Sequence, residues 1–237
     1  MQVLTTLLDL VYPRWCAGCG RTMFDHPLHI CWECLSSFTR VEAPYCSKCG
    51  DPVDGMVEHD FVCGACRALP PAFDRARSAL RYRGSLRNAL GAFKYGRTPC
   101  ICRDFEPFLS GCLDVHYASA GFDAVTFVPL YHAKERERTF NQARLLAHRV
   151  ASRRGLPLLC DCLRRTRKTE TQTGLRAVQR TENVRGAFRS RNDAWLEGRR
   201  LLLVDDVMTT GATVDACSRA LKSAGAALVC VLTLARG

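Results

Sequence analysis

The stretch LLLVDDVMTTGATVDAC (201–217) places two adjacent carboxylates at the end of an apolar run. Asp205 and Asp206 are followed by threonines and a glycine before an amphipathic stretch begins. Carboxylates accept hydrogen bonds from sugar hydroxyls, and threonine hydroxyls and the backbone N–H groups around glycine bind phosphate oxygens. This order of residue types predicts a site for a phosphorylated ribose.

A second group of chemistry-bearing residues precedes residue 67, where eight of the fifteen cysteines form four Cys-x-x-Cys pairs. Two residues between thiolates let a tight turn direct both sulfurs at one ion, and two turns complete a tetrahedral zinc site. CAGCG and CSKCG each open a unit, so the pairs combine most simply in sequence order, although cross-braced pairing is an alternative. Sites with four sulfur ligands have no open position, so both zinc ions would be structural. The predicted ligands are Cys16, Cys19, Cys31 and Cys34 for one ion, and Cys46, Cys49, Cys63 and Cys66 for the other.

The other histidines and cysteines of the chain do not extend these ligand sets. His26, His29 and His59 lie beside complete sets, so we expect them at the surface. The later cysteines lack metal-binding spacing, and we expect them to be small buried hydrophobic residues. They are Cys100, Cys102, Cys112, Cys160, Cys162, Cys217 and Cys230. Cysteines used for metal rather than disulfides, with no secretory signal, favour a cytoplasmic protein.

Charge is unevenly distributed along the chain. The segment 134–191 holds 16 Lys and Arg against 5 Asp and Glu, so it carries the whole net charge of +11. Such a segment favours an anionic partner, either phosphate groups of a small molecule or nucleic acid, and a solvated basic surface is the alternative interpretation. No apolar run approaches the roughly 20 residues that cross a bilayer, so membrane insertion is not expected.

Alternating strands and helices must position these residues. PPAFDR, from Pro70, marks a boundary between residues 1–69 and 70–237, and the second part has the pattern of a mostly parallel α/β sheet flanked by helices. In such sheets ligands bind beyond the carboxyl ends of the strands, where helix N-termini attract phosphate. We predict strands at 76–84, 122–130, 156–163, 199–206 and 227–235, helices at 5–11, 86–95 (capped by Ser85), 103–113, 141–153 and 213–224, and loops at 131–142 and 164–185.

The segment LLLVDDVMTTGAT (201–213) resembles the phosphoribosyl pyrophosphate (PRPP) loop of type I phosphoribosyltransferases. Nearly the whole chain, from about Leu7 to Arg236, resembles the ComF-like competence proteins, which join cysteine turns to that domain. VPLYHAKERERTFNQA (128–143) and RRTRKTETQTGLRAVQRTENVRGAF (164–188) carry further parts of the resemblance. It implies a small zinc-ribbon domain over 1–69 and a phosphoribosyltransferase-like domain over 70–237.

The resemblance also implies roles for individual residues. Asp205 and Asp206 would contact the ribose hydroxyls, and Arg136 and Arg138 would meet the pyrophosphate, bridged by Mg²⁺. The basic segment 164–185 would close as a lid. The 5′-phosphate would lie on Met208, Thr209, Thr210, Gly211, Ala212 and Thr213.

Two departures from the family pattern bear on function. Thr139 stands where the family has glycine, so the backbone of that loop is expected to differ. Thr209 stands where purine-salvage relatives carry an acid/base aspartate, which favours an amine acceptor or a non-catalytic role. Lys94, Asn141 and Gln142 match the pattern too, although an exposed cation and a helix cap would explain them equally well.

Two functions are consistent with these features. The first is Mg²⁺-dependent transfer of phosphoribosyl from PRPP to a nitrogen acceptor, linked to DNA uptake or competence. The alternative is a zinc-ribbon protein that handles single-stranded DNA, with PRPP as a regulatory or structural ligand. The sequence leaves the acceptor and the oligomeric state open.

Overall fold

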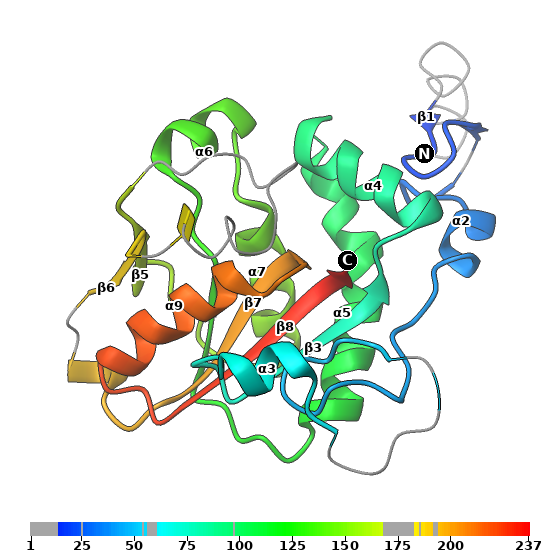
Figure 1. Ribbon diagram of the computed structural model, residues 1–237. Helices are drawn as coiled ribbons and strands as arrows, with labels where there is room; N and C mark the ends of the chain where they lie inside the picture. Colours follow the sequence, from blue (N-terminus) through cyan, green and yellow to red (C-terminus); the bar gives the residue numbers. More distant parts are fainter. Residues whose placement is uncertain are drawn as a thin grey trace.

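The centre of the fold is a four-stranded parallel sheet, seen in the computed structural model in Figure 1. In spatial order its strands are β3 (Arg75–Arg81), β8 (Leu228–Arg236), β7 (Arg200–Met208) and β4 (Ala124–Phe127). The apolar run Leu201–Val204 is completely buried, because helices cover both faces of the sheet. The predicted mostly parallel α/β sheet is therefore confirmed.

The structure describes residues 14–24, 26–53, 55, 61–96, 98–167, 183–184, 186–191 and 194–237. The helix predicted over 5–11 lies outside the described residues, and so do His59 and most of the basic segment 164–185.

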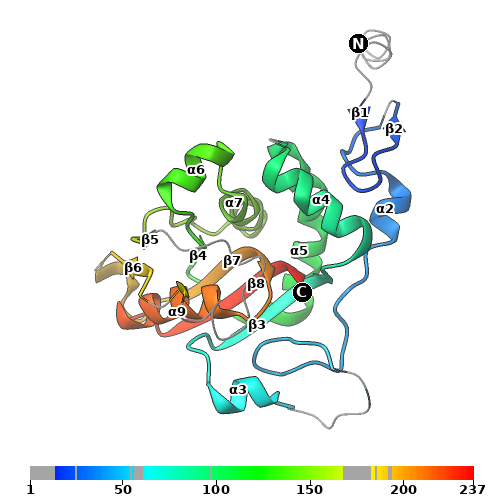
Figure 2. The same cartoon turned by 45° about the horizontal axis from the view of Figure 1, so that its top comes forward.

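Three helices cover the two faces of the sheet and a fourth reaches its carboxyl edge. Figures 1 and 2 show α5 (Cys102–Tyr117) and α7 (Gln142–Arg154) on one face and α9 (Ala212–Ser223) on the other. The fourth helix, α4 (Gly84–Tyr95), follows β3 and brings its last turn to the end of β7. The carboxyl ends of the strands thus meet residues from α4 and α9.

The predicted elements differ from the observed ones in three places. The loop predicted at 131–142 contains a helix, α6 (His132–Arg138), built from charged residues with good helix propensity. The helix α4 starts before Ser85, whose hydroxyl lies 2.7 Å from that of Ser37 instead of capping the helix. The strand predicted at 156–163 is reduced to a single bridge between Leu158 and Val125. The chain then forms a ribbon outside the sheet, with β5 (Leu163–Arg165) antiparallel to β6 (Phe188–Ser190).

The cysteine-rich part contains only short elements within the described residues. They are β1 (Arg14–Trp15), β2 (Thr22–Met23), α2 (Trp32–Ser36) and α3 (Gly64–Ala68). Outside this part, the chain also forms two short 3₁₀ helices, η1 (Pro99–Ile101) and η2 (Ala194–Leu196). This part is tied to α5 by Asp104, a buried carboxylate that accepts hydrogen bonds from His29 N at 2.7 Å and Ile30 N at 2.9 Å. Because those N–H groups immediately precede Cys31, Asp104 anchors the first cysteine unit.

Burial of the remaining cysteines only partly follows the prediction. Cys102, Cys112, Cys162, Cys217 and Cys230 are buried, as expected of small apolar residues. Cys100 and Cys160 are exposed, so the prediction is wrong for these two. Among the described residues, no helix combines the length and apolar character needed to traverse a bilayer.

Candidate functional site

The loop between β7 and α9 joins a strand end to a helix N-terminus. Gly211 has a φ of +80°, a left-handed conformation that favours glycine over residues with a Cβ. The N–H groups of the first turn of α9 open toward this loop, which is the arrangement that binds phosphate. The loop encloses a small hollow of about 10 Å³, which is room for one water.

Asp205 and Asp206 point to opposite sides of β7, as adjacent strand residues must. Asp206 Oδ2 lies 2.8 Å from Lys94 Nζ, and its Oδ1 accepts a hydrogen bond from Val207 N at 2.7 Å. Asp205 Oδ1 accepts one from Asp206 N at 2.9 Å. Burial, and then the negative charge of Asp206, raise the pKa of Asp205 to about 8. The pair is therefore electrostatically strained, and a cation or hydroxyl donor would relieve it.

A polar cavity of about 180 Å³ lies beside this pair. Burial and then the positive charges of Arg138, Arg165 and Lys94 lower the pKa of Lys134. Cations that repel one another in a partly buried cavity favour the binding of a polyanion. The charged residues that line the polar cavity are Lys94, Lys134, Arg138, Arg165, Asp205 and Asp206.

The α6–α7 connection positions the cationic side of the cavity. Arg138 donates a hydrogen bond to Gln142 Oε1 at 3.1 Å and its guanidinium lies 5.0 Å from the centre of the Tyr95 ring. Thr139 adopts a left-handed conformation with a φ of 69°, which suits the family's glycine and costs a β-branched residue about 1–2 kcal/mol. The backbone of this loop thus takes a glycine-like form in spite of the threonine. Asn141 caps α7 by accepting from Arg144 N at 3.3 Å, as a helix-cap interpretation of this residue predicts.

The structure brings most of the predicted residues together, with two exceptions, Arg136 and Thr210. Arg136 is exposed and does not belong to the described lining of the cavity, so its role stays a prediction. Lys134 was missed from the sequence because α6 was not recognised. On a helix, residues 134 and 138 share a face while 136 points elsewhere, so recognising the helix would have identified Lys134.

Five of the six residues predicted to hold the 5′-phosphate line the small hollow of the β7–α9 loop, whereas the sixth, Thr210, is exposed. The residues predicted to hold the 5′-phosphate that also line the hollow are Met208, Thr209, Gly211, Ala212 and Thr213.

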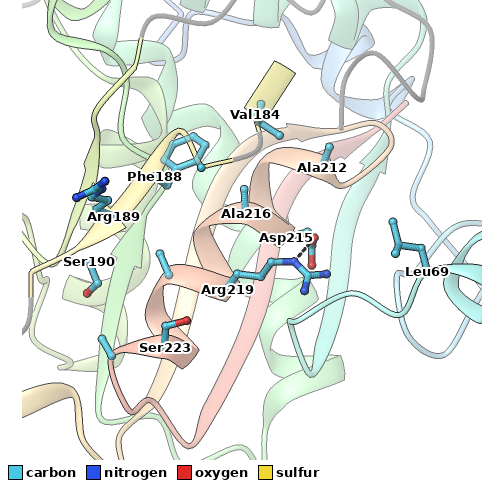
Figure 3. Close-up of a pocket in the computed structure, with 13 residues that line it drawn as sticks. Leu69, Val184, Phe188, Arg189, Ser190, Ala212, Asp215, Ala216, Arg219 and Ser223 are labelled. Atoms are coloured by element: carbon cyan, nitrogen blue, oxygen red, sulfur yellow. Dashed lines mark hydrogen bonds and ion pairs between the residues drawn. The ribbon is translucent and has the colours of Figure 1, made fainter. Parts of the chain in front are cut away.

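A larger cavity, of about 910 Å³, lies along α9 and shares only Ala212 with the described lining of the small hollow. Figure 3 shows Ala212, Ala216 and Arg219 of α9 on one side of it and Phe188 and Arg189 of β6 on the other. Its acid, Asp215, already accepts hydrogen bonds from Arg219 Nε at 3.0 Å and Ala72 N at 2.6 Å. Because the Asp215 carboxylate already accepts these hydrogen bonds, it is less available to bind a ligand than the charged groups of the polar cavity are.

The cysteines form two groups in sequence order, and cross-braced pairing is not observed for them. Within each group the sulfurs lie within 4.8 Å of one another, and Cys19 Sγ to Cys31 Sγ and Cys49 Sγ to Cys63 Sγ are both 3.8 Å. A tetrahedral zinc with Zn–S bonds of about 2.3 Å requires sulfurs roughly 3.8 Å apart. The donor set and its spacing therefore fit two structural zinc ions.

Backbone N–H groups stabilise the sulfurs of both groups. Cys16 Sγ accepts from Gly18 N at 3.3 Å and from Cys31 N at 3.2 Å. Cys46 Sγ accepts from Cys63 N at 3.3 Å. Such donors favour thiolates, the form that binds zinc.

Comparison with known proteins agrees with both parts of this description. Residues 7–67 match a family model described as a double zinc ribbon domain, and residues 141–237 match a phosphoribosyl transferase domain. Neither match ends at residue 69 or 70, so the division into 1–69 and 70–237 stays a prediction. Among solved structures, adenine phosphoribosyltransferase from Thermoanaerobacter pseudethanolicus matches with a TM-score of 0.41 at 18% identity, covering 70% of this chain and 81% of that one.

Curated relatives match over nearly the full length. Competence protein F of Haemophilus influenzae is 32% identical over 214 residues, which is 87% of this chain and 88% of the relative. DNA utilization protein YhgH of Escherichia coli is 31% identical over 232 residues, covering 96% of this chain and 99% of the relative. Competence protein ComFC of Bacillus subtilis is 28% identical over 215 residues, covering 87% and 84%. The chain therefore belongs to the ComF-like family, in which a double zinc ribbon precedes a phosphoribosyltransferase domain.

Proposed function

We propose that the protein binds PRPP and transfers its phosphoribosyl group to a nitrogen acceptor. The observation that carries this proposal is the polar cavity at the end of β7, where four cationic side chains meet two carboxylates beside the phosphate loop. In this assignment the loop holds the 5′-phosphate, Asp205 and Asp206 hold the ribose hydroxyls, and the cations meet the pyrophosphate. We place the reaction in the cytoplasm, where thiols stay reduced and available to zinc.

The transfer breaks the bond between ribose C1 and the pyrophosphate oxygen, and the electron pair leaves with pyrophosphate. The acceptor nitrogen forms the new bond to C1 and releases one proton to solvent. Lys134 and Arg138 neutralise the charge that grows on the leaving group, which lowers the barrier in a partly dehydrated site. Thr209 offers no acid or base group, which suits an amine acceptor that attacks as the neutral amine and loses its proton to solvent without a protein base.

The oxygen-rich donor set of carboxylates and ligand phosphates fits Mg²⁺, which prefers hard oxygen ligands. Asp205 is the better protein candidate to hold it, because Asp206 Oδ2 is already paired with Lys94 at 2.8 Å. When bound, the ion would supply further charge neutralisation to the pyrophosphate.

Calorimetric titration of PRPP with and without Mg²⁺ tests this assignment. We expect binding that Mg²⁺ strengthens, and we expect Lys134→Met to weaken it by about ten-fold, because a partly buried cation–phosphate contact is lost. Arg149→Met, an exposed change on the neighbouring helix α7, serves as the charge-matched control and should leave affinity within about two-fold. Undetectable PRPP binding, or equal effects of the two variants, would contradict the assignment. Pyrophosphate release in the presence of amines then tests turnover.

A second function, binding of single-stranded DNA, is favoured by one specific feature. The first cysteine unit exposes three aromatic side chains, Trp15 at 64%, Phe24 at 62% and Trp32 at 63%. Exposed aromatics beside basic residues are typical of surfaces on which bases stack. The names of the curated relatives, which refer to competence and DNA utilization, agree with such a role.

Fluorescence anisotropy with a labelled oligonucleotide tests this second function. We expect Trp32→Ala to weaken binding roughly ten-fold, since one base stack contributes about 1–3 kcal/mol. Affinity should also fall steeply with salt. Val115→Ala removes an equally exposed apolar side chain on α5 and is the control. DNA affinity that is the same in all three proteins would remove the stacking role. PRPP binding without turnover, together with DNA binding, would make PRPP a regulatory or structural ligand.

A further inference from the structure

The loop between β7 and α9 is held by a residue that lies outside the described lining of the polar cavity and of the small hollow. Arg236, the last residue of β8, is only 8% exposed, and its Nη1 donates hydrogen bonds to Met208 O at 3.1 Å and to Thr209 O. The next residue, Gly237, donates from its N–H to Met208 O at 3.0 Å. The two carbonyls at which the chain leaves β7 and enters the loop are therefore fixed from the neighbouring strand.

The same guanidinium also reaches the cysteine-rich part. Arg236 Nη2 lies 2.9 Å from Asp51 Oδ1. Asp51 closes the second metal-binding turn, because its carbonyl accepts a hydrogen bond from Cys46 N at 2.8 Å. Gly50 N bonds to Cys46 O, also at 2.8 Å, so the turn that carries Cys46 and Cys49 sets the position of Asp51.

This turn is seated against the edge strand of the sheet. Ala76 N donates to Lys48 O at 2.8 Å, and Arg77 Nη1 donates to Ser47 O at 3.0 Å. A Cβ on Gly50 would lie 2.7 Å from Ala76 O, which is too close for any other residue. The turn is thus held against β3 by hydrogen bonds and joined to the end of β8 by the pair of Asp51 and Arg236.

We infer that Arg236 is a positioning residue for the phosphate loop, and that through Asp51 it makes the loop's geometry depend on the second zinc-binding turn. This inference rests on the proposed binding of PRPP. Because Arg236 fixes the carbonyls of Met208 and Thr209, it holds the start of the loop in the arrangement whose N–H groups would bind a phosphate. Arginine suits this role because its planar fork bonds two carbonyls and a carboxylate at once, which lysine cannot do.

Binding of ribose 5-phosphate and of pyrophosphate, the two parts of PRPP, each a half-ligand, distinguishes a positioning role of Arg236 from a general loss of structure. Ribose 5-phosphate depends on the loop, whereas pyrophosphate with Mg²⁺ depends on the polar cavity, whose lining does not include Arg236. We expect Arg236→Lys to weaken ribose 5-phosphate binding about ten-fold, the loss of one to two hydrogen bonds made by a charged donor. Asp51→Asn should weaken it by about two- to four-fold, since the carboxylate is 47% exposed. Pyrophosphate affinity should stay within about two-fold of the wild type in both variants.

The control is a more exposed arginine–aspartate pair at the opposite end of β7, where Arg199 Nη1 lies 3.8 Å from Asp123 Oδ1. Arg199→Lys should change neither affinity. Wild-type affinity for ribose 5-phosphate in both Arg236→Lys and Asp51→Asn would overturn the inference and leave the proposed function intact. A parallel loss of both half-ligands would also overturn it, because it indicates a general structural role. A wild-type protein that binds neither half-ligand would overturn the proposed function and this inference together.

Discussion

Asparagine at position 205 is expected to make the folded protein more stable while it weakens PRPP binding. Burial and the adjacent Asp206 raise the pKa of Asp205 to about 8, so ionisation of this carboxyl opposes folding at neutral pH and above. Asparagine keeps an acceptor for Asp206 N, which lies 2.9 Å from Asp205 Oδ1, and removes the charge. We expect a gain in the free energy of unfolding of about 1–3 kcal/mol at pH 8, measured by urea denaturation.

The pH dependence of this gain follows from the direction of the shift. Because the pKa of Asp205 is higher in the folded state than its ordinary value of 3.8, the folded state binds more protons between those two pKa values. The stability that the protonated Asp205 contributes is complete below about pH 4 and is lost as the pH rises toward 8. The advantage of Asp205→Asn over the wild type should therefore grow from pH 5 to pH 8. A constant advantage would contradict the assigned cause.

The same substitution, Asp205→Asn, is expected to weaken PRPP binding although it stabilises the fold. Above pH 8, where Asp205 is mostly ionised, removing this charged acceptor for a ribose hydroxyl should lower PRPP affinity by about ten- to one-hundred-fold, since such hydrogen bonds contribute about 1.5–3 kcal/mol. The control is Asp114→Asn, which changes a carboxylate on α5 that is paired with Arg154. It should leave PRPP affinity unchanged. A destabilised Asp205→Asn that binds PRPP normally would show that this carboxylate is structural.

The loop between β7 and α9 was predictable because everything that defines its structure is contiguous in the chain. An apolar run, two carboxylates, glycine and a helix start follow one another between 201 and 213, and local geometry places them at a sheet edge. The zinc ligands were predictable for the same reason, since each turn is local and the repeated unit indicated the pairing. In both cases the spacing of the residues along the sequence is enough to predict which of them lie close together in the fold.

The cations that line the polar cavity could not be selected from the sequence alone. The segment 134–191 holds 16 Lys and Arg, and which of them face the cavity depends on where α6 begins and how β5 leaves the sheet. Lys94 is more than a hundred residues from its partner Asp206 and reaches it only because α4 ends over β7. The link between Asp51 and Arg236 joins residues from opposite ends of the chain, and no local pattern marks it.

Loss of zinc from the second site should have the largest structural effect of any single change. Cys46 is completely buried, and the cysteine-rich part contains only short elements among the described residues, so metal binding supplies much of its folding energy. We expect Cys46→Ser to retain about one zinc per chain and to be cleaved far faster by protease around residues 40–69. Metal analysis and limited proteolysis measure both effects.

Cys100→Ser is the matched control, because Cys100 is an exposed cysteine outside both groups, and it should keep two zinc ions and the wild-type cleavage pattern. Comparison with Cys16→Ser distinguishes the two sites. The first site is anchored to α5 through Asp104, whereas the second is anchored to the phosphate loop through Asp51 and Arg236. Both variants should lose a zinc ion, but only Cys46→Ser should also lose affinity for ribose 5-phosphate. Retention of both ions by Cys46→Ser would contradict its place in the ligand set, and equal losses of affinity in the two variants would contradict the separate anchoring.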